Sequence, residues 1–231
     1  MESMENSDFN FKLNTEPNPA FLRLKVNNRS KDFTISSKKI KIKIHSIVLQ
    51  ETKYFQLFNN ENFNFDEYII KSNIDPVVIS KVIDFNYTNE ITGIKPSQFA
   101  DLIVLLYTFQ DTVIEPSFVK HLDDLNYYPI ELLITSINEY MNTQKKEVHK
   151  ILINSLQYYL DKEIENTELF MNLIHDGTQV LELIVNELLN LNINNNKIDK
   201  FIHKLLKIEY FNSNMHNEKN KGSINEKKYN T

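Results

Sequence analysis

The chain has 231 residues, of which 41% are hydrophobic and 25% charged, so it can bury a core of ordinary globular size. Its net charge of −5 gives no general attraction to nucleic acid or anionic membranes, and the absence of cysteine excludes disulfides, thiolate metal sites and cysteine nucleophiles. The three glycines (Gly93, Gly177 and Gly222) lie too far apart for a phosphate-binding loop, and no catalytic motif is present. We therefore expect neither enzymatic activity nor a cofactor.

The first part of the chain predicts short strands followed by a helix. Residues 1–19 are polar, and we expect them to be disordered, with neither a secretory signal nor a membrane-spanning run. Apolar and polar side chains alternate in residues 21–26 and 40–44, and residues 32–35 are a further short candidate, so strands are expected in all three segments. From residue 46 to residue 58 the apolar side chains recur at helical spacing, which predicts a helix.

A fourth strand and three helices are expected next. Residues 68–71 predict the strand, and Asp75-Pro76 predicts a helix start, because Asp accepts from the first free N–H groups and Pro fits the first helical position. Gly93 and Pro96 are expected to bracket the next turn. The two further helices are expected at residues 99–109 and 116–125.

The rest of the chain carries helical patterns alone. Its apolar stripes predict a stack of antiparallel helices with short connections, at residues 130–141, 148–160, 169–174, 180–191 and 198–208. The charged, Asn-rich end of the chain predicts disorder. The expected organisation is a disordered segment at 1–19, a mixed domain at 20–126, a helical region at 127–210 and a disordered tail at 211–231.

Four pieces of the first domain, in order, resemble the BTB/POZ family. They are Asp32-Phe33-Thr34-Ile35, the stretch from Ile42 to Leu49 with His45 in it, the pair Tyr54-Phe55, and Ile83-Asp84-Phe85-Asn86-Tyr87-Thr88. The resemblance covers about residues 21–125 and implies an α+β fold, in which a small sheet is flanked by helices. The all-α extension behind it lies where BTB-kelch proteins have their BACK region, but no kelch repeats follow.

The resemblance also implies a function. BTB domains have no catalytic site; they self-associate, and many bind a cullin scaffold while a second region captures a substrate for ubiquitination. We therefore expect an intracellular interaction module, cytoplasmic or nuclear, that forms homodimers or pairs with other BTB proteins. Two alternatives stay open: an adaptor that docks on a cullin-type ubiquitin ligase, and a self-associating or decoy module that recruits no ligase.

The resemblance points to five candidate site residues. Asp32, His45 and Ser46 match the region of the family's dimer interface, where the family usually has a basic residue in place of Ser46. Asp32 is therefore expected to lack its usual partner. Phe65 and Glu67 match a hydrophobic-x-Glu element that contacts the cullin in the family. The alternative is that Phe65 covers the edge of the core and Glu67 is solvated.

Two other sets of residues are expected to carry no site. The basic stretch from Arg29 to Lys43 could contact phosphates. Its strand lysines all lie on one face, however, and we expect that face to be exposed to solvent, so no nucleic-acid partner is expected. The six histidines are scattered without metal-ligand spacing, and neither a metal nor a membrane partner is expected. The richness in Asn, Ile and Lys is typical of an AT-rich genome, such as that of a large DNA virus or some protists.

Overall fold

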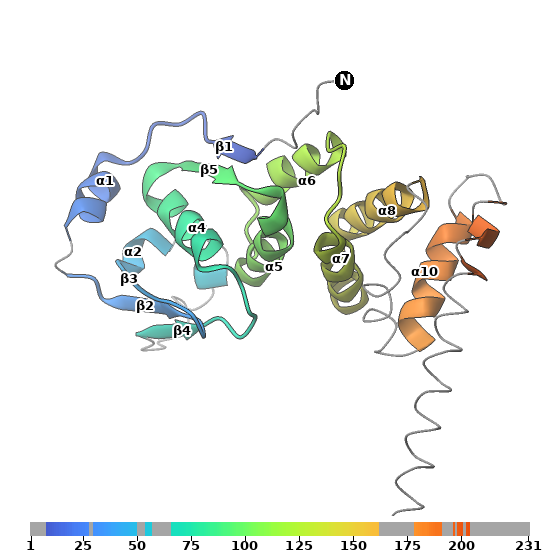
Figure 1. Cartoon of the computed structure of the whole chain (residues 1–231). Helices are drawn as coiled ribbons and strands as arrows, with labels where there is room; N and C mark the ends of the chain where they lie inside the picture. Colours follow the sequence, from blue (N-terminus) through green and yellow to red (C-terminus); the bar gives the residue numbers. More distant parts are fainter. Residues whose placement is uncertain are drawn as a thin grey trace, which may run out of the picture. The chain divides into compact units, whose positions relative to one another are not determined.

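The computed structural model describes residues 8–27, 30–49, 54–56, 66–161, 178–190, 196, 198–200, 202 and 203. The chain divides into two compact units, Met1–Ile151 (unit 1) and Leu152–Thr231 (unit 2). Unit 1 is an α+β arrangement of small sheets and packed helices (Figure 1), which agrees with the expected α+β class.

A three-stranded sheet in unit 1 has the order β3-β2-β4. Its strands are β2 (Phe33–Ser36), β3 (Lys41–Ile44) and β4 (Glu67–Ile69). Strands β2 and β3 are antiparallel, whereas β2 and β4 are parallel. In β3 the side chain of Ile44 is buried while Lys41 and Lys43 are exposed, which is the alternation that predicted the strand. The three strands predicted in this region are confirmed, within one or two residues at each end.

A second sheet was not predicted. It pairs β1 (Phe9–Lys12) with β5 (Glu90–Ile94) in antiparallel fashion. Phe9 is 1% exposed, and its ring lies 5.1 Å from that of Phe118 between centroids. The expected disorder of residues 1–19 is therefore wrong for this strand, because a buried aromatic side chain anchors it. The turn expected between Gly93 and Pro96 does not begin at Gly93, because Gly93 lies inside β5 with a φ of +64°, opposite an irregularity in β1.

Residues 19–26 form a helix, α1 (Pro19–Val26), so the strand predicted at 21–26 is wrong. The Asn18 side chain accepts a hydrogen bond from the Ala20 backbone N–H at 2.9 Å, and Pro19 takes the first helical position. These start signals outweigh a six-residue alternation that fits a strand equally well. No residue of α1 is buried.

Helices α4 (Pro76–Thr88) and α5 (Phe99–Phe109) form the centre of unit 1. The predicted start of α4 is confirmed, since the Asp75 side chain accepts from the Val77 N–H at 2.8 Å. Unit 1 also contains the short helices α2 (Ser46–Leu49) and η1 (Pro96–Gln98) and the longer α6 (Glu115–Asp123) and α7 (Ile130–Thr143). Because α7 packs on α5, unit 1 extends past the boundary expected at residue 126.

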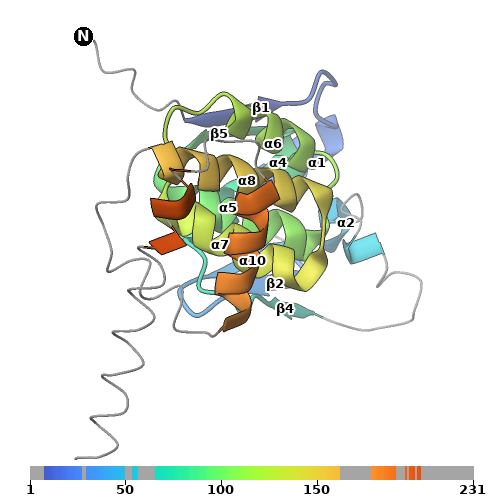
Figure 2. The ribbon, with the colours of Figure 1, turned by 90° about the vertical axis from the view of Figure 1, so that its right-hand side faces the viewer.

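Helix α8 (Lys146–Asp161) runs across the division between the units, and α10 (Thr178–Asn190) lies in unit 2. In α10 (orange in Figure 2) the side chains of Val180, Ile184 and Leu188 are buried at the predicted helical spacing. The stripe expected at 169–174 and the tail expected to be disordered at 211–231 lie outside the described residues.

The burial of Phe9 generates a stability prediction. Phe9→Ala should lower the free energy of unfolding by about 3–5 kcal/mol, because it leaves a cavity beside Phe118. Val77→Ala is the control, since Val77 is 47% exposed, and it should change stability by less than about 0.5 kcal/mol. Urea unfolding followed by circular dichroism measures both. Equal stabilities for the two variants would show that β1 is not part of the core.

Candidate interaction surface

Asp32 and Ser46, predicted to lie in one interface, contact each other directly. Both carboxylate oxygens of Asp32 accept hydrogen bonds from Ser46: one from its backbone N–H at 2.8 Å, the other from its hydroxyl at 2.7 Å. Asp32 was expected to lack its usual basic partner; in its place, a serine at the first position of α2 satisfies the carboxylate. Partial burial opposes ionisation, but the bonds from Ser46 outweigh it, so the pKa of Asp32 lies below its ordinary value.

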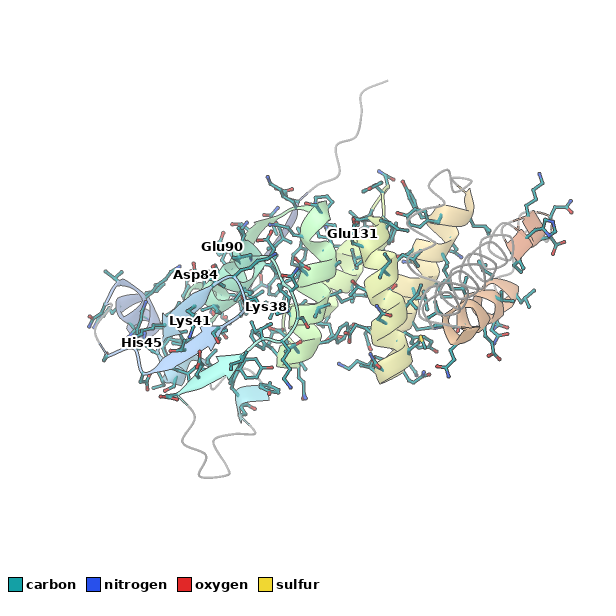
Figure 3. The ribbon with its side chains drawn as sticks, turned by 60° about the horizontal axis from the view of Figure 1, so that its bottom comes forward. Lys38, Lys41, His45, Asp84, Glu90 and Glu131 are labelled. Carbon is teal, nitrogen blue, oxygen red and sulfur yellow. The ribbon has the colours of Figure 1, made fainter. Side chains whose placement is uncertain are left out.

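His45, the third residue of this set, faces the interior. Its side chain is 3% exposed, and the Tyr87 hydroxyl oxygen lies 3.0 Å both from its backbone nitrogen and from its Nδ1 (Figure 3 labels His45). The tyrosine thus ties the end of β3 to α4, and burial raises its pKa. His45 directly precedes Ser46, so its contacts with Tyr87 help to fix the backbone next to the Asp32–Ser46 contact. Its buried side chain is not accessible to a partner protein.

An apolar surface that the sequence did not predict lies on α1 and α2. Leu22, Val26 and Ile47 are 39%, 86% and 49% exposed, and we call them the α1–α2 surface. The two helices both pack on α4. An ion pair between Lys25 and Asp84, 3.3 Å long, also joins α1 to α4. Such an exposed pair contributes little stability. The contacts of α1 with α4 position the helix, and its apolar side chains Leu22 and Val26 remain exposed.

Of the two residues predicted to contact a cullin, the structure describes only Glu67. Phe65 lies outside the described residues. Glu67 begins β4, and its carboxylate lies 3.4 Å from the Lys41 ammonium across the sheet. Hydrogen bonds from Ser36 and Lys41, together with the charge of Lys41, lower the pKa of Glu67. The Glu67 side chain is 37% exposed and its carboxylate already has partners within its own sheet, and both interpretations of this element stay open.

The lysines near β3 lie in solvent. Lys38, Lys39, Lys41 and Lys43 are all exposed, as the sequence predicted (Figure 3 labels the first and third). The described part of the chain contains no group of three or more His, Asp or Glu side chains able to hold a metal ion. Nor does any described helix have the length and hydrophobicity needed to cross a bilayer.

Comparison with known proteins adds no assignment: no family model matches the sequence, and no match is found among curated proteins. The functional interpretation therefore rests on the geometry of the described residues. The sequence did contain the signal for the α1–α2 surface, because Asn18-Pro19 is a helix start. A helix beginning there turns Leu22 and Val26, four residues apart, toward one face.

The Asp32–Ser46 contact generates a pH prediction. Its lowered pKa means that ionised Asp32 stabilises the fold above the ordinary value of 3.8, and that this contribution is lost as the pH falls through the folded-state pKa. Asp32→Asn should therefore be less stable than wild type at neutral pH, by at most about 1 kcal/mol given its exposure. The difference should shrink toward zero below pH 3.8.

Denaturant unfolding at a series of pH values measures this difference. Asp124→Asn is the matched control, since Asp124 is exposed and ends α6 through backbone contacts. A stability gap between wild type and Asp32→Asn that is the same at every pH would contradict the role of the charge.

Proposed function

We propose that this chain is a non-enzymatic protein–protein interaction module of the BTB/POZ type that pairs with a second copy of itself. The observation that carries the proposal is the α1–α2 surface: a capped helix leaves Val26 86% exposed, with Leu22 on the same face of α1, and Ile47 of α2 is 49% exposed. The element order β2-β3-α2-β4-α4 is the order that the family resemblance implies, and it supports the proposal.

A twofold dimer suits this surface. Burying a Val, Leu or Ile side chain contributes about 1.5–3 kcal/mol, so three of them form only a small patch. In a twofold arrangement the same patch is buried on both copies, which doubles the apolar contribution without a second kind of surface. The Asp32–Ser46 contact lies directly before Ile47 and fixes the position of α2 within this surface.

Docking on a cullin-type ubiquitin ligase is the finer part of the proposal. It rests on the resemblance of Phe65 and Glu67 to the family's element and on the place of Glu67 in β4, an edge strand that another chain can reach. The alternative is a self-associating or decoy module without a ligase, and it is favoured by the contact that Glu67 already makes with Lys41.

Self-association predicts a change of mass in a surface variant. Light scattering across a dilution series should find a dimer for the wild type, and Val26→Asp should raise the dimer dissociation constant about tenfold or more. Val77→Asp is the matched control, because Val77 is 47% exposed on α4, and it should leave the dimer intact. A monomeric wild type, or a folded Val26→Asp variant that dimerises as well as wild type, would refute the proposed interface.

Ligase docking predicts binding to the N-terminal domain of a cullin with a low micromolar dissociation constant. Phe65→Ala should weaken this binding about tenfold, whereas Phe63→Ala, in the same segment, should leave it unchanged. Isothermal titration calorimetry measures both. No binding by the wild type would leave the self-associating alternative in place, because the dimer is tested independently.

A further inference from the structure

A cavity of about 480 Å³ opens in unit 1 where α5 and α7 end and α6 begins. Tyr107 and Thr108 of α5, Glu115 of α6 and Glu139 of α7 line it. Lys145, in the turn between α7 and α8, is the remaining charged side chain of the lining. The cavity is remote in sequence from the α1–α2 surface, and nothing in the proposed self-association uses it.

The charges of this cavity favour a positively charged ligand. Burial raises the pKa of both Glu115 and Glu139, and Lys145 offsets that effect only in part. Glu147 and Asp111 add further negative charge around Glu115. Two partly buried carboxylates thus share a single lysine, so a second cation would be stabilised there.

Tyr107 supplies a second, independent observation. Its side chain is 8% exposed and lines the cavity, and its buried hydroxyl lies beside the Glu115 carboxylate, with which it interacts. Burial and the nearby Glu115 raise its pKa. The face of its ring is occupied by the chain's own Lys145, whose ammonium lies 4.3 Å from the ring centroid. The cavity therefore holds an aromatic face for a cation, flanking carboxylates and a buried hydroxyl.

Lys145 is a replaceable occupant of that face. It follows Gln144, which ends α7 in the left-handed conformation with a φ of 54°, so its side chain comes from a turn. A lysine side chain has four rotatable carbon–carbon bonds and can leave the ring by rotating into solvent. A guanidinium group would fill the same place better, because it stacks flat on an aromatic ring and donates to two carboxylates at once.

A neighbouring groove favours a peptide as the source of that group. It is lined by Pro116 and Val119 of α6 and by Lys146 and Lys150 of α8, and it shares Glu115 and Lys145 with the cavity. Its volume of about 640 Å³ gives room for main chain on either side of an inserted side chain. We propose that the cavity binds the guanidinium group of an arginine side chain from a partner protein, and that Lys145 occupies it in the free chain.

The test is a titration of the full chain with the peptide acetyl-Gly-Gly-Arg-Gly-Gly-amide, followed by NMR. Wild type should bind this peptide more tightly than free arginine amide, since the groove contributes contacts to the main chain. The same peptide with citrulline, which is neutral and has almost the same shape, should not bind. Equal binding of the arginine and citrulline peptides, or none at millimolar peptide, would overturn the proposal.

Two variants separate displacement of Lys145 from simple charge attraction. Lys145→Ala should tighten arginine-peptide binding about two- to fivefold, because the ring face is then vacant. Lys120→Ala removes the same charge from an exposed position on α6, outside the lining of the cavity and of the groove, and should leave the affinity nearly unchanged. Glu139→Gln should weaken binding about fivefold. Affinities that rise equally in Lys145→Ala and Lys120→Ala would show general attraction to an acidic surface and refute the site.

Discussion

The arrangement of unit 1 depends on the burial of α5 on nearly all sides. Eight of its eleven residues are buried, from Phe99 to Phe109, so other elements must enclose it. At its start the Phe99 ring lies 5.4 Å from Phe118, which also contacts Phe9. At its end the Phe109 ring lies 6.1 Å from that of Tyr68 in β4. Aromatic contacts at both ends thus connect α5 to the two sheets, and α7 covers a further side.

Elements with strong local signals were predictable from the sequence. The start of α4 at Asp75-Pro76 and the alternation in β3 each depend on neighbouring residues alone, and both appear as expected. Strands β1 and β5 were missed because each is short and finds its partner far along the chain. Helix α1 was assigned to a strand because its apolar side chains satisfy either pattern over so few residues. The boundary at residue 126 ignored that α5 requires α7 as cover.

The same distinction between local signals and long-range contacts applies to the candidate sites. The family resemblance put Asp32 and Ser46 in one region, and the two residues do contact each other. Their chemistry was not foreseen, because a short serine reaches the carboxylate only through the particular position of α2. The cavity at Tyr107 could not be predicted at all: its carboxylates and lysine are isolated in the sequence, and folding alone brings them around one ring.

The pairing of β1 with β5 has a consequence for the order in which unit 1 can assemble. Phe9 is among the first described residues, yet its partners lie in β5 and α6. During synthesis, the start of the chain must therefore wait until α6 has left the ribosome before it can dock. Contacts of such long sequence separation slow folding, because the connecting chain must lose its freedom before the contacts form. Until then, the apolar face of α5 is open to chaperones or to other chains.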